Sequence, residues 1–353
     1  MRQAIMNEPG VIEIRDVTEP VPGPGQVRIR VRRIGVCGSD IHVWHGKHPY
    51  TGYPVVQGHE FSGVVESTGE GVTEPAPAQK VTALPQVVCG ECGPCRRGDY
   101  HICDVLRVQG FQAPGCAQEL FVTDAEKVVG LPESFTFEQG ALVEPTAVAV
   151  HAATRAPDLG TKNVAVLGAG PIGNLVAQTA RARGANVLIT DVSGFRLDVA
   201  RRCGLEATSN PREENLRAAV ERVFGRQGLE VVFECVGIEE TLTAAVETVG
   251  KGGTIVVVGV FAVPPRVNVG LVQDRELNIH GTLMYRREDY VEAVALIGDG
   301  KIATAPLESK HFPLAEYADA YAFIEEQHDR IMKVFIDLQV PVRLVGEEGV
   351  EPS

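Results

Sequence analysis

The sequence has none of the segments that would place a protein in a membrane, on a nucleic acid or in a secretory pathway. No uninterrupted apolar stretch reaches the roughly 18 residues of a membrane-spanning helix. No long run of Lys or Arg occurs, and the formal net charge is −13, from 33 basic against 46 acidic side chains. This balance argues against nucleic acid as a partner. The N-terminus has neither the apolar segment nor the cleavage site of a signal peptide. We therefore expect a cytoplasmic globular protein with neither a membrane nor a nucleic-acid partner.

Internal repeats and low-complexity tracts are also absent, so the organisation of the chain is read from its local patterns. At 353 residues the chain exceeds the usual size of a single core, and 44% hydrophobic residues suffice to fill two. The first 150 residues form short segments of β-strand character between Gly and Pro, such as 26–32 and 61–67. From residue 162 apolar strands alternate with helical patterns, which predicts parallel βαβ units. The further expected elements are strands 163–167, 186–190, 230–233 and 254–258, helices 171–183 and 287–297, strand 333–338 and a frayed acidic tail over 346–353.

Half of the eight cysteines, Cys89, Cys92, Cys95 and Cys103, lie within fifteen residues. Thiolates at this spacing can converge on one ion, and four of them saturate a tetrahedral zinc at about 2.3 Å each. Disulfides need an oxidising compartment, and incidental core cysteines do not explain the spacing. A saturated zinc binds no substrate, so we expect this cluster to organise a loop. The isolated Cys116, Cys203 and Cys235 are expected to be buried apolar residues.

A glycine loop, Gly168-Ala-Gly170-Pro-Ile-Gly173, lies where the first strand of the βαβ part must turn into a helix. Gly168 permits the tight turn, Gly170 lets the backbone approach a pyrophosphate, and Gly173 lets the helix pack against the strand. Asp191 ends the next strand, 18 residues after Gly173, where a carboxylate accepts hydrogen bonds from an adenosine ribose. The loop therefore predicts a dinucleotide site.

Asp191 also indicates which dinucleotide binds, because an acidic side chain repels a 2′-phosphate and so favours NAD over NADP. The alternative is that Asp191 caps the following helix. Arg196, five residues further on, either stacks near the adenine or offers a site for a 2′-phosphate.

A second group of possible metal ligands lies near the N-terminus, in Cys37-Gly-Ser39-Asp40-Ile-His42 and Gly58-His59-Glu60. Three protein ligands with one open position form the catalytic arrangement of zinc. Zinc in such a site can bind an alcohol oxygen and lower its pKa. Taken singly, His59 and Cys37 are equally compatible with ordinary surface or core positions.

The run Gly58-His59-Glu60, followed by Gly63, Gly69 and Val72, resembles the signature of the zinc-dependent medium-chain alcohol dehydrogenases. The four cysteines and the glycine loop follow in that family's order, so the resemblance spans nearly the whole chain. It implies an α/β fold in which a doubly wound Rossmann sheet binds NAD and a GroES-like, β-rich domain carries the catalytic site. The implied domains are 1–148 with 287–353, including a structural zinc lobe at about 86–106, and the Rossmann domain 149–286. Family members are dimers or tetramers, so we expect a homo-oligomer.

Within the family, the chain is most similar to the polyol branch, which includes sorbitol, 2,3-butanediol and threonine dehydrogenases. Classical alcohol dehydrogenases carry a zinc-binding cysteine where this chain has Glu144, in the run Gly140-Ala-Leu-Val-Glu-Pro145. The resemblance implies that Cys37, His59 and Glu60 hold the catalytic zinc, while Glu144 either ligates it or holds its water. Exchange of the two carboxylates with water or substrate during turnover is a hypothesis.

The resemblance also implies roles in proton transfer. Ser39 corresponds to the hydroxyl residue that takes the alcohol proton, His42 to the end of the relay to solvent, and Asp40 to a carboxylate that orients His59. His42 can equally be a plain surface histidine, since polyol enzymes can route protons through zinc-bound water and a glutamate. The expected catalytic residues are Ser39, His42, Glu60 and Glu144.

Further positions resemble contacts to the cofactor and the substrate. Ile172 corresponds to a pyrophosphate contact, while Val258-Gly259-Val260 and Thr282-Leu283-Met284 correspond to stretches that line the nicotinamide, although they are also ordinary strand ends. Met284 stands where sorbitol dehydrogenases carry a substrate-binding arginine, and the run 281–286 is closer to butanediol dehydrogenases. Side chains of the pocket loop that can contact substrate are Trp44, His45, His48, Tyr50 and Phe111.

We therefore expect an oxidoreductase with NAD and two zinc ions per chain, one catalytic and one structural, that oxidises a polyol or vicinal diol to a ketone. The nearer alternative is L-threonine or another amino alcohol as substrate. The more distant alternative is a non-catalytic or zinc-independent relative of the quinone reductase or crystallin type. Such relatives lack the zinc ligands that this chain retains.

Overall fold

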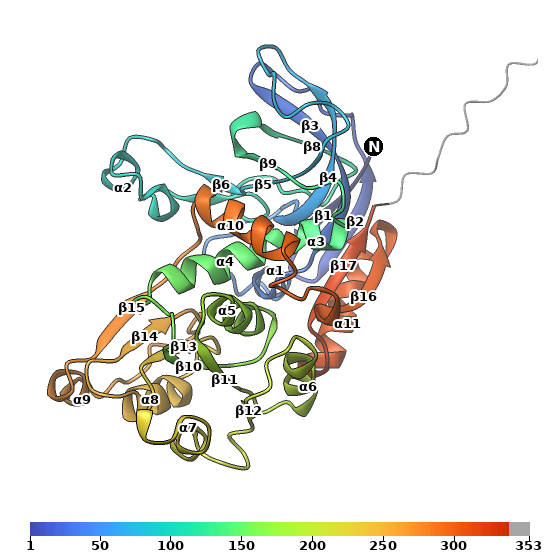
Figure 1. Cartoon of the computed structure of the whole chain (residues 1–353). Coiled ribbons are helices and arrows are strands. Elements are labelled where there is room, and N and C mark those ends of the chain that lie inside the picture. The colour runs from blue at the N-terminus through green and yellow to red at the C-terminus, as the bar shows by residue number, and fades with distance from the viewer. Residues whose placement is uncertain (339–353) are drawn as a thin grey trace, which may run out of the picture.

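The computed structural model describes residues 1–338. Between residues 163 and 281, six strands form an entirely parallel sheet (Figure 1). The strand order is β12-β11-β10-β13-β14-β15. This is the doubly wound order in which the first strand lies at the centre and a dinucleotide binds where the order reverses. Here that position is the carboxyl end of β10. The strands are β10 (Asn163–Leu167), β11 (Asn186–Thr190), β12 (Thr208–Ser209), β13 (Val231–Glu234), β14 (Thr254–Val257) and β15 (Asn278–Gly281).

Helices cover both faces of this sheet, because its central strands present apolar side chains in both directions. Val164 and Val166 of β10 pack in the core on the side of α4, α5 and α10, whereas Ala165 and Leu167 pack with α7 and α8. The helices of this part are α4 (Val143–Thr154), α5 (Pro171–Ala182), α6 (Gly194–Arg202), α7 (Leu216–Phe224), α8 (Glu239–Thr248), α9 (Val269–Asp274) and α10 (Arg287–Gly298).

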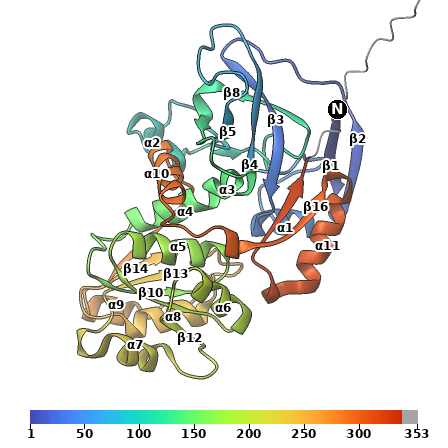
Figure 2. The ribbon, with the colours of Figure 1, turned by 45° about the vertical axis from the view of Figure 1, so that its right-hand side comes forward.

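A second sheet of seven strands joins the two ends of the chain (Figures 1 and 2). Its order is β16-β17-β3-β4-β5-β9, and β8 pairs with β3. The late strand β17 therefore lies beside β3, which places residues 333–337 next to the metal-ligand segments near the N-terminus. The strands are β3 (Gln26–Gly35), β4 (Glu60–Thr68), β5 (Lys80–Ala83), β8 (Leu120–Asp124), β9 (Val128–Gly130), β16 (Glu308–Pro313) and β17 (Lys333–Asp337).

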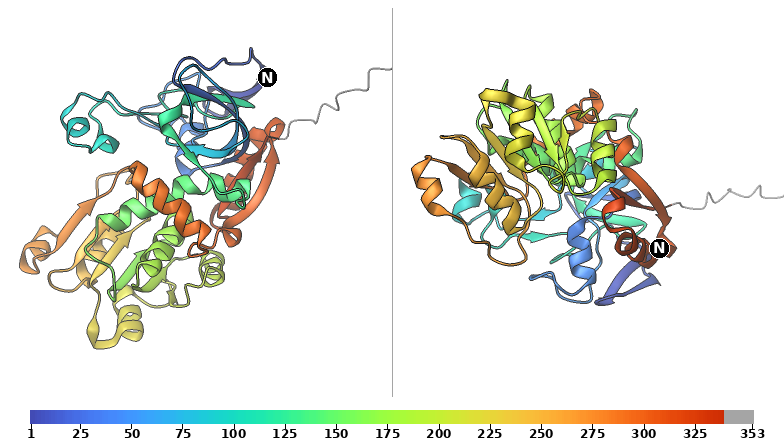
Figure 3. Two further views of the ribbon diagram at one scale, coloured as in Figure 1. Left: turned by 45° about the horizontal axis from the view of Figure 1, so that its top comes forward. Right: turned by 90° about the horizontal axis from the view of Figure 1, so that it is seen from below.

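Smaller elements complete the β-rich part. The segment that carries α2 and η1 projects from it as a separate lobe (Figure 3). These elements are β1 (Arg2–Glu8), β2 (Val11–Asp16), α1 (Gly38–Trp44), β6 (Gln86–Val87), α2 (Gly93–Arg96), η1 (Tyr100–Ile102), β7 (Arg107–Val108), η2 (Ala125–Lys127), α3 (Phe137–Ala141), η4 (Ala305–Leu307), η5 (Leu314–Glu316), α11 (Tyr317–Gln327) and η6 (His328–Arg330). The short η3 (Gly225–Gln227) follows α7 in the parallel-sheet part.

The predicted α/β fold, with a Rossmann sheet and a β-rich part, is confirmed. The strands 163–167 and 186–190 have the expected bounds, and the other expected elements of the second half differ by single residues at their ends. The β-rich reading of the first 150 residues was wrong for α4, which contains Glu144. Pro145 lies in the first turn of this helix, where its missing N–H has no partner to lose, so it does not break the helix.

The expected domain boundary after residue 148 falls inside α4, so a helix and not a loop connects the two parts. α4 packs against both α5 and α10. The predicted acidic tail over 346–353 lies outside the described residues. Among the residues that are described, no helix has both the length and the apolar character needed to cross a membrane.

Candidate metal centres and cofactor site

The four cysteine sulfurs of the projecting lobe converge on one point. The Sγ atoms of Cys92 and Cys103 are 3.8 Å apart, those of Cys89 and Cys103 3.6 Å, and those of Cys89 and Cys95 4.0 Å. Sulfurs at about 2.3 Å from a tetrahedral zinc are about 3.8 Å from each other, whereas a disulfide requires about 2.05 Å. The backbone N–H of Cys92 also donates to Cys89 Sγ at 3.3 Å. The donor set therefore fits a saturated zinc.

A polar cluster fastens this lobe to the start of α10. The Arg286 guanidinium pairs with Asp99, and the backbone N–H of Arg287 donates to the phenol oxygen of Tyr100 at 2.6 Å. The buried ring of His101 lies 4.7 Å from that of His151, measured between centroids. Burial, followed by the charge of His151, lowers the pKa of His101 to about 4. His101 is therefore neutral in the folded protein at physiological pH.

The second ligand group is assembled inside the β-rich part. Donor atoms of Cys37, His59 and Glu60 all lie within 4.8 Å of one another. Cys37 precedes α1, His59 precedes β4 and Glu60 begins β4. His59 and Glu60 are buried, and Cys37 is partly exposed. One thiol, one imidazole and one carboxylate are zinc ligands, and three such groups leave the fourth position of a tetrahedral ion open.

Asp40 binds one member of this group and lies beside a second. Its Oδ2 accepts a hydrogen bond from the backbone N–H of Cys37 at 2.9 Å, and its Oδ1 lies 3.6 Å from His59 Nδ1. Asp40 thus faces the Nδ1 side of the ring, and Nε2 is left for a metal. The role of Asp40 in orienting His59 stays a prediction, because at 3.6 Å His59 Nδ1 makes no hydrogen bond to it.

Lys333, a residue that the sequence analysis did not identify, binds Glu60 from behind. Its Nζ donates to Glu60 Oε1 at 2.9 Å, to Oε2 at 2.7 Å and to the carbonyl of Val36 at 3.2 Å. Both side chains are almost completely buried. Although burial disfavours the ammonium, the Glu60 carboxylate raises the pKa of Lys333 above its usual value. A Cβ at Gly35 would lie 2.4 Å from Glu60 Oε2, so only glycine leaves room for this carboxylate.

Glu144 lies near these residues but is not a member of the group whose donor atoms lie within 4.8 Å of one another. The hydroxyl of the buried Tyr285 donates to Glu144 Oε1 at 2.5 Å. Burial raises the pKa of Glu144 to about 7; Glu60 contributes to the rise, and His59 opposes it. The sequence analysis left open whether Glu144 ligates a metal or holds its water, and both alternatives stay predictions.

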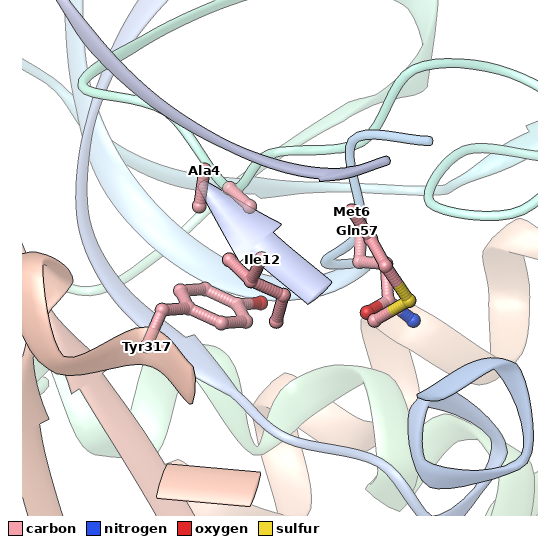
Figure 4. A pocket seen from close by; sticks show the side chains of 6 residues that line it. Ala4, Met6, Ile12, Gln57 and Tyr317 are labelled. Carbon is pink, nitrogen blue, oxygen red and sulfur yellow. The ribbon is translucent and has the colours of Figure 1, made fainter. Parts of the chain in front are cut away.

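Gln57, directly before Gly58, is a buried polar side chain that connects Asp40 to α11. Its Oε1 accepts from the Tyr321 hydroxyl at 2.9 Å, and its Nε2 donates to the carbonyl of Asp40 at 3.3 Å. Figure 4 shows Gln57 at the edge of an apolar hollow, lined also by Ala4, Met6, Ile12, Ala117 and Tyr317, which has no room for a water molecule. Because Gln57 is buried, its amide depends on these protein partners.

The expected proton-relay residues lie on α1. Ser39 is partly exposed, and His42 is exposed. In the pocket loop, the ring of Phe111 lies between two histidines, 4.8 Å from His48 and 5.0 Å from His59. Phe111 and His48 therefore lie beside the ligand group.

The other expected pocket-loop residues, Trp44, His45 and Tyr50, contact α11 or solvent. Trp44 stacks on Tyr321 at 5.3 Å, and His45 pairs with Glu325, so both contact α11. Tyr50 is 77% exposed. These three side chains contribute to packing or surface in this structure.

Each glycine of the dinucleotide loop has the geometry that its expected role requires. Gly168 has φ of 97°, in the left-handed region that favours glycine. A Cβ at Gly173 would lie 1.9 Å from the carbonyl oxygen of Gly168, so a side chain there would separate α5 from β10. At Gly170 the atom nearest to an added Cβ would be Arg196 Nη1 at 3.8 Å, which leaves the backbone accessible. Ile172 follows in the first turn of α5.

Asp191 directly follows β11 and is held by backbone groups. Its Oδ2 accepts from the N–H of Ala169 at 2.7 Å, and its Oδ1 from that of Ser193 at 2.8 Å. Arg196 Nη1 lies 3.9 Å from Asp191 Oδ2, so the two charges face each other. Ser193, and not Asp191, accepts the hydrogen bond that caps α6. The helix-cap alternative for Asp191 was therefore wrong.

The expected nicotinamide-lining residues follow the last two strands of the parallel sheet. Val258, Gly259 and Val260 come directly after β14, and the run from Thr282 to Met284 comes directly after β15. Val260 is 85% exposed and Leu283 54% exposed. Both segments lie at the carboxyl edge of the sheet, where doubly wound folds bind their cofactors.

Two family models match this chain. The alcohol dehydrogenase GroES-like domain matches residues 23–133, and the zinc-binding dehydrogenase model matches residues 171–299. The 2-dehydro-3-deoxy-L-galactonate 5-dehydrogenase of Pseudoalteromonas atlantica is 35% identical over 85% of this chain and 88% of its own length. This chain belongs to the zinc-dependent medium-chain alcohol dehydrogenases. The (R,R)-butanediol dehydrogenase of Neisseria gonorrhoeae is 30% identical over 96% of this chain and 99% of its own.

Solved structures agree with this membership. A zinc-binding dehydrogenase of Sinorhizobium meliloti 1021 bound to NADP has a TM-score of 0.87 at 28% identity, with 96% of this chain and 99% of that chain covered. The alcohol dehydrogenase RspB of Escherichia coli CFT073 with NADH has a TM-score of 0.86 at 28% identity and the same coverage. The protein is thus a zinc-dependent oxidoreductase of the nicotinamide-binding type, as the sequence analysis expected.

Proposed function

We propose that this enzyme transfers hydride from a secondary hydroxyl of a polyol or vicinal diol to NAD and so produces a ketone. The observation that carries the proposal is the largely buried group of Cys37, His59 and Glu60, which has the composition of an open zinc site. A zinc bound there supplies Lewis acidity that lowers the pKa of an alcohol hydroxyl. The second ion of the proposed pair is bound by the four cysteines of the lobe and has a structural role.

Around the first group, the chain's own residues are proposed to bind the substrate and move its proton. Ser39 accepts the hydroxyl proton, and His42, exposed on the same helix, passes it to solvent. Glu144 offers a second route, because a carboxyl group with a pKa near 7 can both accept and release a proton near neutral pH. Phe111 and His48 form the wall against which the substrate lies.

NAD, in preference to NADP, is proposed as the cofactor on the basis of Asp191. Its carboxylate is fixed by two backbone N–H groups at the end of β11 and would repel a 2′-phosphate. Arg196 faces Asp191 and is partly exposed, so its charge is shared with that carboxylate. Replacement of Asp191 by Ser should therefore weaken NAD binding and improve that of NADP.

The names of the relatives support a substrate with several hydroxyl groups, but some of these substrates are neutral and others are acids. A sorbitol dehydrogenase of Halalkalibacterium halodurans, 32% identical, and the butanediol dehydrogenase are named for neutral substrates, whereas the galactonate relative is named for a sugar acid. The pocket loop contains His42, His45, Lys47 and His48 and no acidic residue between 41 and 50. The Lys47 ammonium and the absence of negative charge in this segment favour a sugar acid as the second candidate substrate.

A substrate panel scored by reduction of the nicotinamide tests the proposal. Sorbitol, xylitol, 2,3-butanediol, L-galactonate and L-threonine should be offered with NAD and, in parallel, with NADP. We expect turnover of a polyol, a diol or a sugar acid with NAD. Turnover of threonine alone would replace the proposed substrate class, and a zinc-loaded protein inactive on all of them would contradict the proposal.

We also propose that the enzyme is a cytoplasmic homodimer or homotetramer. β15 is an edge strand of the parallel sheet. Apolar side chains at and beyond it, Ile279, Leu283 and Val260, are 39%, 54% and 85% exposed. An exposed strand edge with apolar side chains is suited to pairing with a second chain. Light scattering coupled to size-exclusion chromatography tests this; a monomer at micromolar concentration would contradict it.

A further inference from the structure

Tyr285 occupies a position between the parallel sheet and the catalytic ligand group. It follows the 282–284 stretch that continues from β15, and its side chain is completely buried. Its hydroxyl donates to Glu144 Oε1 at 2.5 Å, across 141 positions of the sequence. Among the described residues, this is the one hydrogen bond that Glu144 receives from another side chain. A buried carboxyl group without a donor is costly, so the hydroxyl largely determines where the Glu144 carboxyl group lies.

The backbone around Tyr285 is fixed in a conformation that directs its ring inward. Met284 has φ of 51°, in the left-handed region that non-glycine residues rarely adopt. Such a conformation persists where the surroundings enforce it. Here Gln86 Nε2 donates to the carbonyl of Tyr285 at 2.7 Å, and Arg286 and Arg287 are bound by residues of the cysteine lobe. The segment is therefore held at Tyr285 and at the two residues that follow it.

We propose that Tyr285 is a positioning residue that holds the Glu144 carboxyl group beside, and outside, the ligand group of Cys37, His59 and Glu60. Because Tyr285 is covalently joined to the 282–284 stretch, the position of the Glu144 carboxyl group depends on the conformation of that stretch. Glu144 lies close enough to His59 and Glu60 for their charges to act on it. If the hydrogen bond is removed, the carboxyl group is free to turn toward the metal position. This inference rests on the proposed function, because it assumes a metal at that position.

The chain offers a matched control in Tyr290. This tyrosine is also completely buried, and its ring lies 5.1 Å from that of Tyr285. Its hydroxyl donates to the carbonyl of Ala83 at 3.3 Å and not to Glu144. Replacement of either tyrosine by phenylalanine deletes one buried hydroxyl from the same core. Only Tyr285→Phe deletes the donor to Glu144.

The experiment compares Tyr285→Phe with Tyr290→Phe in the full-length, metal-loaded enzyme and in enzyme whose catalytic ion has been replaced by cobalt. For Tyr285→Phe we expect kcat to fall about 10- to 100-fold, the usual cost of removing a group that orients a metal site, with KM for NAD within about threefold. The visible absorption of bound cobalt should change, because the Glu144 carboxyl group moves relative to the ion. Tyr290→Phe should leave kcat within about twofold and the cobalt spectrum unchanged, with a similar loss of thermal stability.

A double-mutant cycle with Glu144→Gln provides a further check. If Tyr285 acts through Glu144, adding Tyr285→Phe to Glu144→Gln should lower kcat less than about twofold further. Equal effects of the two tyrosine variants, or an unchanged cobalt spectrum in Tyr285→Phe, would overturn the inference. The spectrum is recorded without substrate, so it decides about Tyr285 even if the substrate panel fails. A wild-type protein that binds cobalt only in the cysteine lobe would overturn the proposed catalytic centre and this inference with it.

Discussion

The two ligand groups of this enzyme differ in how far apart their members lie in the sequence and in what surrounds them. The four cysteines span residues 89 to 103, on a lobe whose cysteines other than Cys103 are partly or wholly exposed. The group of Cys37, His59 and Glu60 is surrounded by buried Asp40, Glu144 and Lys333. One group needs only its own loop, and the other needs two regions of the chain to meet.

This difference is the basis on which we propose two roles for zinc in one chain. Four thiolates neutralise and enclose an ion, so little beyond the lobe influences it. In the buried group the protein contributes one thiol, one imidazole and a carboxylate that Lys333 also binds. Residues behind the ligands, including Asp40 and Lys333, therefore adjust the charge and position of that site.

Removal of a ligand from the buried group should have the largest effect. We expect Cys37→Ser to lower kcat on the order of 10³-fold or more, which corresponds to about 4 kcal/mol in the barrier. Metal analysis should show one zinc per chain in place of two. Cys116→Ala is the control, since Cys116 is a buried cysteine outside the ligand group. Full activity of Cys37→Ser would contradict the division between the two centres.

Lys333→Met tests whether the charge behind the buried group stabilises the fold. The substitution leaves the Glu60 carboxylate buried without its cation, which typically costs about 3 to 5 kcal/mol. Urea unfolding of the metal-free protein measures this loss. The double variant Lys333→Met with Glu60→Gln should recover most of the stability, because it removes the unpaired charge. If Lys333→Met is as stable as the wild type, the ion pair between Lys333 and Glu60 does not stabilise the fold.

Cys92→Ser should affect assembly and stability before it affects chemistry. Loss of the zinc in the lobe is expected to lower the midpoint of thermal unfolding by about 5 °C. The rate of hydride transfer per folded molecule should stay within about threefold, because no residue of the lobe belongs to the buried group. Calorimetry and steady-state kinetics on the same preparation check both statements. Abolished hydride transfer in a folded and assembled variant would show that the two centres are not independent.

The smallest effect should come from the contact that fastens the lobe. Burial lowers the pKa of His101 to about 4 in the folded protein, against about 6.5 in the unfolded chain. The unfolded chain therefore takes up a proton first, and stability is lost as the pH falls from about 6.5 toward 4, by roughly 2 to 3 kcal/mol. His101→Asn should lose less stability than the wild type between pH 7.5 and 4.5 in urea unfolding. Equal losses would show that His101 does not titrate in this way.

Much of the fold could be predicted because its signals are local. Strand 163–167 is an apolar run directly before the glycine loop, and its bounds were predicted without error. The sequence analysis did not predict α4, because its buried, Ala-rich sequence lacks a polar face. Pro145, in its first turn, is a residue that usually argues against a helix. One weak indication of Lys333 was present in the sequence, because a lysine precedes the apolar run of β17. Nothing in the sequence near Tyr285 or Gln57 indicated their partners.

The sequence by itself determined the spacing of the four cysteines and the place of the glycine loop. In these motifs the reach of a few residues fixes the geometry, so spacing is sufficient. The tertiary structure alone decided that Lys333 lies behind Glu60, that Tyr285 holds Glu144 and that Gln57 connects Asp40 to Tyr321. These contacts join residues 273, 141 and 264 positions apart. Their existence depends on which strands and helices pack together, because spacing along the chain does not constrain groups so far apart.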